Sequence, residues 1–225
     1  MKRLVRLLRV KQWTKNGFVF AAFVFTNQAT EGSADIWRAT LFAFLGMCFV
    51  SSATYIVNDI KDVERDRAHP VKKNRPIASG AVSVGPAWAL ALSMLVGGLA
   101  LGFAVGIPVL VCQLAYLTLQ VAYNVGLKGL AIADVFTIAA GFVLRVVVGA
   151  VAIDVKLSSW ILLCTACLAL LLGFGKRRHE YHLKKDSGFA SRSALSQYNE
   201  RSLDVLVVFS AALAAISYAL YSIES

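Results

Sequence analysis

Long apolar runs constrain this chain more than any other feature of its sequence. A run of about 18 or more apolar residues with almost no charge indicates a membrane-spanning helix. Seven such spans are predicted, at about residues 15–30, 39–57, 86–105, 107–125, 131–152, 158–175 and 203–221. We therefore predict an all-α, polytopic transmembrane helix bundle that forms one integral-membrane domain over residues 1–225.

The composition supports this fold class and excludes several others. Hydrophobic residues make up 58% of the chain and charged residues 16%, against about 45–50% and about 25% in average soluble domains. A disordered segment, a collagen-like repeat and an ordinary cytosolic enzyme are excluded. The basic N-terminus has no cleavage site after its short apolar stretch, so we interpret that stretch as a retained first span.

Glycines recur every four residues in the predicted span 86–105. Gly98, Gly102 and Gly106 give a spacing that lets a neighbouring helix approach closely. The four cysteines all fall within apolar runs, and we interpret them as small packing residues.

Basic residues are unevenly distributed between the predicted loops. Of the 23 Lys and Arg residues, 20 fall in segments 1–16, 58–85 and 176–202 or at Lys128, which seven spans would place on one side. The positive-inside rule assigns this side to the cytoplasm. We expect an inner (plasma) membrane protein with a cytoplasmic N-terminus, cytoplasmic active-site loops at 58–85 and 176–202, and an external C-terminus. The net charge of +10 also suits anionic lipid headgroups, and no nucleic acid partner is expected.

An acidic cluster lies inside the basic loop 58–85. Asn58, Asp62 and Asp66 are spaced at i, i+4 and i+8 and share one face if the helix of the second span continues. Oxygen ligands in this arrangement suit Mg²⁺, which takes one or two carboxylates and completes its shell with water and substrate phosphate. The alternative is a solvated loop of mixed charge, in which ion pairs are weak.

Cations follow the acidic cluster within a few residues. His69, Lys72 and Arg75 are the candidate ligands of phosphate oxygens, and Pro70 and Pro76 stiffen the loop. Carboxylates that hold a metal beside cations that hold phosphate could together stabilise a leaving diphosphate.

Two further clusters contain candidate site residues. The first comprises Tyr123, Lys128, Asp134 and Arg145. Ionisable groups within a span are functional candidates by default, and about 16 Å of helix separates Asp134 from Arg145, so each needs its own partner. Arg145 could also be a structural charge satisfied by carbonyls at helix ends. The second cluster is Lys176, Arg177 and Glu180, where Glu180 could bind metal or orient the cations; an ordinary basic stop after a span is the alternative.

The chain resembles the UbiA superfamily of intramembrane prenyltransferases, and within it the polyprenyl-phosphate (decaprenyl-phosphate type) phosphoribosyltransferases. N58-D-x-x-D62-x-x-x-D66 is similar to the first aspartate-rich motif of that superfamily. The other matches are Q12-W-x-K15-N16, the run D66-R-x-H-P-x-K-K-x-R-P-I-A-S-G80, Lys128 with Asp134 before A-A-G-F-V-L-R145, the run K176-R-R-H-E180, and Q197-Y-N-E200. The chain departs from the pattern of this superfamily in two ways. It has seven predicted spans instead of the usual nine, as a fragment or a shortened member would, and it lacks the second D-x-x-x-D motif.

The resemblance implies Mg²⁺-dependent transfer of 5-phosphoribose from phosphoribosyl pyrophosphate to a polyprenyl phosphate, releasing diphosphate, in cell-envelope arabinose-donor biosynthesis. It implies catalytic roles for Asp62, Asp66, Lys128 and Asp134, and it adds Lys15 and Asn16 to the substrate-binding residues. The alternative activity is prenyl transfer from a polyprenyl diphosphate to an aromatic acceptor such as 4-hydroxybenzoate. A transporter or scaffold without chemistry is the third hypothesis, and a homo-oligomer stays open.

Overall fold

The fold comes from a computed structural model that describes residues 2–26, 33–187 and 193–224. All regular elements in these ranges are helical. The chain divides into two compact units, Met1–Leu117 with Val147–Val155, and Thr118–Val146 with Lys156–Ser225. Each unit is described by itself.

Among the described residues, six helices are long and apolar enough to cross a membrane. They are α4 (Ala34–Lys61), α6 (Val84–Val105), α7 (Ile107–Val125), α8 (Ala133–Ala152), α9 (Ser159–Ser187) and α10 (Glu200–Glu224). They coincide with the last six predicted spans, so the prediction of a polytopic helix bundle is confirmed. α9 continues to Ser187, and residues 176–187 are therefore helix where a loop was expected; residues 188–192 of that segment lie outside the described residues.

The first predicted span takes a different helical form. α1 (Lys2–Leu7) is followed by an 11-residue 3₁₀ helix, η1 (Val10–Phe20), and by a short α2 (Ala21–Phe25). Thr14, Asn16 and Gly17 are weak α-helix formers, and a 3₁₀ helix covers more length per residue. Residues 27–30 of the predicted span are not among the described residues.

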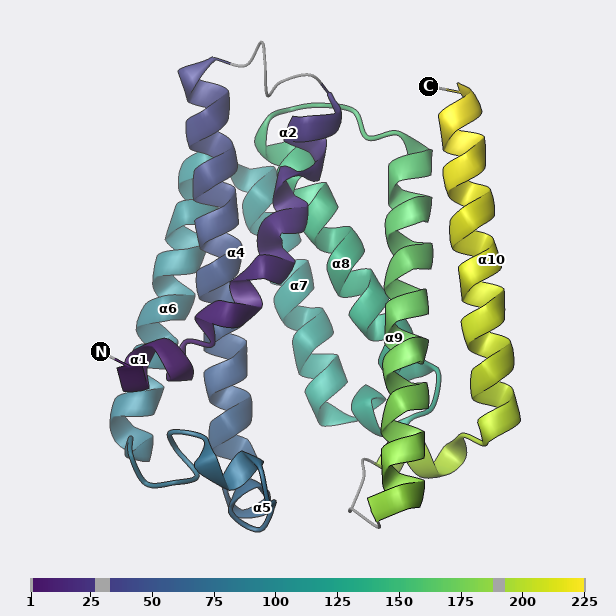
Figure 1. The fold of residues 1–225 in the computed structure, drawn as a ribbon. Helices are drawn as coiled ribbons and strands as arrows, with labels where there is room; N and C mark the ends of the chain where they lie inside the picture. Colours follow the sequence, from purple (N-terminus) through teal and green to yellow (C-terminus); the bar gives the residue numbers. More distant parts are fainter. Residues whose placement is uncertain (1, 27–32, 188–192, 225) are drawn as a thin grey trace. The chain divides into compact units, whose positions relative to one another are not determined.

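This N-terminal segment runs antiparallel to α4 (Figure 1). Trp13 donates a hydrogen bond from Nε1 to the Ser52 hydroxyl at 3.0 Å, and further along the rings of Phe20 and Phe44 lie 5.2 Å apart. With about 2.0 Å rise per 3₁₀ residue and 1.5 Å per α residue, η1 and α2 cover about 30 Å, which is the thickness of a bilayer core. The segment is thus long enough to act as the seventh span, although its described residues form no α-helix of span length.

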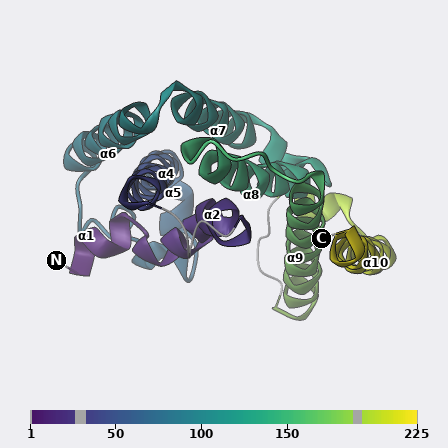
Figure 2. The same cartoon turned by 90° about the horizontal axis from the view of Figure 1, so that it is seen from above.

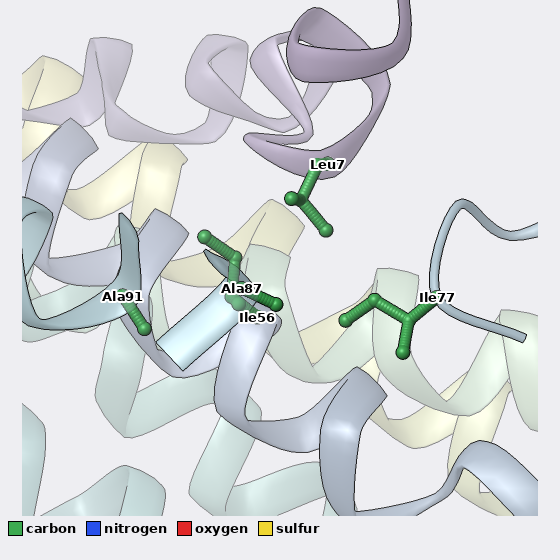
Figure 3. Close-up of a cluster of buried hydrophobic side chains, with 5 residues drawn as sticks. All are labelled: Leu7, Ile56, Ile77, Ala87 and Ala91. Carbon is green, nitrogen blue, oxygen red and sulfur yellow. The ribbon is translucent and has the colours of Figure 1, made fainter. Parts of the chain in front are cut away.

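A buried apolar cluster closes the first unit near the end of α4 (Figure 3). Leu7, Ile56, Ile77, Ala87 and Ala91 are each at most 3% exposed. This cluster joins the N-terminal segment, α4, the loop after α4 and the start of α6. Two of the predicted basic segments, 1–16 and 58–85, therefore meet at the same end of this unit.

The predicted close approach is confirmed at Gly98 and Gly102, whereas Gly106 follows the end of α6, where a Cβ would lie at an ordinary 3.6 Å from Pro108 Cδ. A Cβ atom at Gly98 of α6 would lie 2.9 Å from the Gly46 carbonyl oxygen of α4 and 2.8 Å from a Val50 methyl group. At Gly102 a Cβ would overlap the Gln113 side chain, whose Nε2 donates to the Gly98 carbonyl at 3.2 Å. Only glycine leaves room for these contacts, which is how small residues bring membrane helices together.

The second unit is built around α9 and α10, which lie side by side (Figure 2). Its apolar cluster consists of Val135, Phe174, Leu195, Tyr198 and Leu203. The described residues 193–199 between the two helices include η4 (Ser193–Gln197), and they pack against the loop before α8 through the polar contacts described below. Outward-facing apolar side chains on α10 remain largely exposed, as expected of a multi-pass membrane protein whose helices contact lipid.

Candidate active site

The predicted metal ligands lie where α4 ends. α4 stops at Lys61, Asp62 follows with φ −94° and ψ 9°, and α5 (Val63–Arg67) continues the chain. The Asp62 N–H donates to the Asn58 carbonyl at 3.0 Å and the Asp66 N–H to the Asp62 carbonyl at 2.8 Å. Because i to i+4 backbone hydrogen bonding continues across the junction, Asn58, Asp62 and Asp66 lie about one helical turn apart, as their spacing in the sequence predicts.

The side chains of these three residues have different surroundings. The Asn58 Oδ1 atom is buried and has no hydrogen-bond partner among the described residues. The Asp62 side chain is 23% exposed, with Arg65 Nη1 at 4.0 Å. The Asp66 side chain is only 3% exposed and is paired with Arg75. We call Asn58, Asp62 and Asp66 the row. It presents one amide oxygen without a hydrogen-bond partner among the described residues, one accessible carboxylate and one buried carboxylate.

Asp66 belongs to a buried ion cluster beside the row. Arg75 Nη1 donates to Asp59 Oδ1 at 2.9 Å and to Asp66 Oδ2 at 2.6 Å, and both carboxylates are 3% exposed. Arg9 also pairs with Asp59, and its guanidinium lies 5.1 Å from the centre of the Tyr55 ring. Two arginines thus compensate two buried carboxylates, each of which would otherwise cost several kcal/mol to bury.

The oxygen atoms of the row fit a magnesium ion that keeps most of its water. A buried carbonyl oxygen without a donor calls for an explanation such as an ion, and Mg²⁺ is typically bound through one or two carboxylates. In the part of the chain that the structure describes, no three His, Cys, Asp or Glu side chains form a metal-binding group. Asn58 and Asp62 are therefore the better candidates, and Asp66 could join them only by giving up its bond to Arg75.

The loop after α5 holds the predicted phosphate ligands in a turn. His69 Nδ1 accepts hydrogen bonds from the backbone N–H groups of Val71 at 3.2 Å and Lys72 at 3.3 Å. His69 therefore shapes the turn through Nδ1, which must be unprotonated to accept. Lys72 begins the 3₁₀ turn η2 (Lys72–Asn74) and is half-buried.

Lys15 and Asn16 lie on η1, in the same unit. Lys15 is exposed, whereas Asn16 is 1% exposed. Asn16 Nδ2 donates to the Ser51 hydroxyl at 3.1 Å and to Cys48 Sγ at 3.3 Å. These contacts hold η1 against α4, so the predicted substrate-binding residue Asn16 has a packing contact in the structure.

In the second unit Asp134 is fully buried at the start of α8. Its Oδ2 accepts from Arg177 Nε at 2.6 Å, and its Oδ1 accepts from the Tyr198 hydroxyl at 3.3 Å. Burial raises the pKa of Tyr198; the hydrogen bond from the Ile132 N–H, the next largest effect, lowers it, and the Asp134 charge raises it further. The raised pKa favours the protonated phenol as the donor. Asp134 therefore has the partner from elsewhere in the chain that the sequence requires.

Arg177 is neutralised by two carboxylates. Besides Asp134, its Nη1 donates to Glu180 Oε2 at 2.6 Å, and its side chain is 3% exposed. Lys176 is 65% exposed and lies 3.9 Å from Glu180 Oε1. Glu180 thus orients the neighbouring cations, which was one of the two roles predicted for it, and Lys176 is the more accessible cation.

Three predicted site residues lie on other elements of the second unit. Tyr123 is half-buried near the end of α7, and Lys128 is half-buried in the 3₁₀ turn η3 (Leu127–Gly129). Arg145 is 4% exposed on α8. Its Nη1 donates to the Gly141 carbonyl at 2.6 Å, and its guanidinium lies 5.4 Å from the Phe142 ring centre. Gly141 lies inside α8, one turn before Arg145, so the carbonyl contact differs from the predicted alternative of helix-end carbonyls.

The sequence interpretation missed four residues that hold these clusters together. They are Arg9, Asp59, Gln197 and Tyr198. Asp59 stands next to Asn58 in the acidic run, but its partner Arg9 is 50 residues away, and no local spacing indicates the pair. Gln197 and Tyr198 belong to a matched run of the resemblance, without an assigned role.

Comparison with known proteins agrees with the fold and with the family that the sequence resembles. The profile of the UbiA prenyltransferase family matches residues 18–223. The chain is 35% identical to the decaprenyl-phosphate phosphoribosyltransferase of Mycolicibacterium smegmatis, covering 97% of this chain and 70% of the relative. It is 36% identical to the enzyme of the same name from Corynebacterium glutamicum, over 98% of this chain and 67% of the relative.

Solved structures give the same fold. A UbiA homolog from Archaeoglobus fulgidus bound to DMAPP and Mg²⁺ superimposes with a TM-score of 0.80 at 19% identity, over 98% of this chain and 78% of the homolog. The all-helical architecture is therefore shared, and the matched profile spans nearly all of the sequence. The chain belongs to the UbiA prenyltransferase family of membrane-embedded transferases.

Proposed function

We propose that the chain transfers 5-phosphoribose from phosphoribosyl pyrophosphate to a polyprenyl phosphate and releases diphosphate. The choice of substrates follows the relatives named decaprenyl-phosphate phosphoribosyltransferase, which match 97–98% of the chain. One observation carries the chemistry: the buried Oδ1 of Asn58 has no hydrogen-bond partner in the described part of the chain and lies one helical turn before the accessible carboxylate of Asp62. These oxygen atoms of Asn58 and Asp62, which we call the metal edge, suit a magnesium ion shared with a diphosphate.

Asn58 and Asp62 would hold Mg²⁺, which when bound supplies positive charge to the departing diphosphate. Lys72 lies in the same loop and would bind phosphate oxygens, and Arg75 would do so on release from Asp66. In the second unit, Lys128 and the exposed Lys176 are the proposed phosphate contacts. Asp134 is buried and would act through Arg177, as a positioning residue.

The proposed reaction needs little proton transfer. An oxygen of the lipid phosphate attacks the anomeric carbon of the ribose, the bond from that carbon to the diphosphate oxygen breaks, and the electron pair leaves with the diphosphate. The nucleophile is already an anion, so positioning rather than a strong general base is required.

We further propose that the protein lies in the inner membrane with its N-terminus and the loop after α4 in the cytoplasm. The cluster around Leu7 and Ile77 brings both basic segments of the first unit to one end, and the positive-inside rule assigns basic segments to the cytoplasmic side. A cytoplasmic site is also where a soluble, highly charged phosphoribosyl donor would reach the protein.

Incubation of membranes that contain the protein with labelled phosphoribosyl pyrophosphate tests the function. Labelled lipid should form only when polyprenyl phosphate and Mg²⁺ are both present. Prenyl transfer is the rival activity, because the homolog of similar fold was solved with DMAPP. Turnover of a polyprenyl diphosphate with 4-hydroxybenzoate, without any labelled lipid from the first substrate pair, would replace our proposal by the rival.

A further inference from the structure

Two adjacent side chains, Gln197 and Tyr198, bind the loop that leads into α8 through hydrogen bonds. Gln197 Nε2 donates to the Gly129 carbonyl at 2.9 Å, and its Oε1 accepts from the Ala131 N–H at 3.0 Å. The Tyr198 hydroxyl accepts from the Ile132 N–H. Three polar contacts, to Gly129, Ala131 and Ile132, thus fix a loop that precedes these side chains by more than 60 residues in the chain.

The loop that Gln197 and Tyr198 bind, residues 129–132, contains a strained residue. Ile132 has φ +68°, a left-handed conformation that is a genuine outlier for a β-branched residue. Its side chain is 46% exposed, so burial of that side chain does not explain the conformation. Strained backbone persists where surrounding contacts enforce it, and here the Tyr198 hydroxyl holds the Ile132 N–H directly.

The same hydroxyl connects the loop to the buried ion pair. Tyr198 is 7% exposed within the apolar cluster that includes Phe174 and Leu203, and its hydroxyl lies 3.3 Å from Asp134 Oδ1. Asp134 in turn holds Arg177. One phenol therefore couples the end of the loop to the charged residues of α8 and α9.

Lys128 is the residue that this arrangement would position. It lies in η3 between Gly126 and Gly129, two residues that give the backbone unusual freedom. Gln197 binds the carbonyl of Gly129, which is the residue directly after Lys128. This contact adds to the backbone hydrogen bonds of η3, in which the Gly129 N–H donates to the Gly126 carbonyl at 2.9 Å and the Leu130 N–H to the Leu127 carbonyl at 3.2 Å.

We propose that Gln197 and Tyr198 are positioning residues that fix Lys128 for contact with a phosphate group of the substrate. The role of Lys128 rests on the function proposed above. The hydrogen bonds from Gln197 and Tyr198 to the loop, which we call the clamp, rest on the observed contacts alone. Gln197 and Tyr198 act through the loop and do not themselves touch the reacting atoms.

Amide hydrogen exchange followed by mass spectrometry tests the clamp. In Gln197→Ala the Ala131 amide loses its acceptor, and in Tyr198→Phe the Ile132 amide does; exchange in peptides covering 127–134 should accelerate about tenfold. Tyr181→Phe is the matched control, since the structure shows no hydrogen bond to that hydroxyl among the described residues. Unchanged exchange in both clamp variants would overturn the clamp.

Binding of labelled inorganic pyrophosphate with Mg²⁺ to the detergent-solubilised chain tests the positioning role. Gln197→Ala should weaken binding about fivefold, and Lys128→Ala at least as much. In the Lys128→Ala background, Gln197→Ala should have no further effect, because residues that act as one unit are not additive. A purely structural defect would weaken binding in both backgrounds, and that result would overturn the role.

The outcomes separate this inference from the proposed function. Faster exchange together with the non-additive loss of pyrophosphate binding supports the positioning role even if the wild-type chain transfers no phosphoribose. Unchanged pyrophosphate affinity in Gln197→Ala would overturn the role even if phosphoribosyl transfer is demonstrated.

Discussion

Removal of either partner of the buried Asp134–Arg177 pair should destabilise the second unit, whereas removal of both should cost much less. Asp134 is fully buried and the Arg177 side chain is 3% exposed, so a charge left behind cannot be hydrated. Breaking a buried ion pair in this way typically costs about 3–5 kcal/mol.

The remaining contacts rank the two single variants. Arg177→Met leaves a buried Asp134 carboxylate with the Tyr198 hydroxyl at 3.3 Å, so we expect a cost near the upper limit, about 5 kcal/mol. Asp134→Leu leaves Arg177 with Glu180 at 2.6 Å, so a cost of about 3 kcal/mol is expected. The double variant has no buried charge at this position, and Glu180 keeps Lys176 as a neighbour at 3.9 Å.

Equilibrium unfolding of the detergent-solubilised protein by titration with SDS measures these free energies. The double variant Asp134→Leu/Arg177→Met should be more stable than either single variant, which gives a coupling free energy of about 3 kcal/mol or more. The pair Arg178–Asp204 joins α9 to α10 with both side chains nearly half exposed, and Arg178→Met should cost only about 0–1 kcal/mol. Additive costs in the double variant would refute the argument from buried charge.

Three further predictions test other parts of the structure. Gly98→Ala should destabilise by about 1–3 kcal/mol, because its Cβ would overlap α4, whereas the neighbouring Gly97→Ala has ordinary contact distances and should gain up to about 1 kcal/mol; a similar effect at both positions in SDS unfolding would contradict the packing. Arg75→Met should destabilise more than Arg9→Met, because Arg75 bridges two buried carboxylates and Arg9 contacts only one of them; the reverse order in the same assay would show that the bridge is unimportant. The pKa of Tyr198 is raised by burial, so the stabilisation by its protonated hydroxyl is complete below about pH 10 and is lost as the pH rises through the raised value. The stability difference between wild type and Tyr198→Phe should therefore decline only above about pH 10, and a decline near neutral pH would argue against it.

The six long spans could be predicted from the sequence because length and apolarity alone set the requirement for crossing a bilayer. The first span could not be predicted in its observed form. Its apolar heart is short, and the 3₁₀ helix η1 depends on contacts such as Asn16 with Ser51 of α4. Such contacts between segments 35 residues apart are absent from any local pattern.

The candidate site shows the same division between local and distant information. The spacing of Asn58, Asp62 and Asp66 predicts their succession along the chain because all three lie within three helical turns. The spacing does not reveal that Arg75 forms an ion pair with Asp66, or that Arg177 is paired with both Asp134 and Glu180. A sequence shows which residues carry charge, but whether a cation is accessible depends on tertiary partners.

Binding of Mn²⁺, a paramagnetic substitute for Mg²⁺, tests the central claim most directly, because it reports on the proposed metal edge without requiring turnover. Electron paramagnetic resonance of the purified protein should detect bound Mn²⁺ in the presence of inorganic pyrophosphate, with affinity reduced about tenfold or more in Asp62→Asn. Glu64→Gln is the matched control, since Glu64 is an exposed carboxylate paired with Arg67 in the same segment, and it should bind Mn²⁺ as the wild type does. Equal Mn²⁺ affinity in wild type and Asp62→Asn would contradict the account.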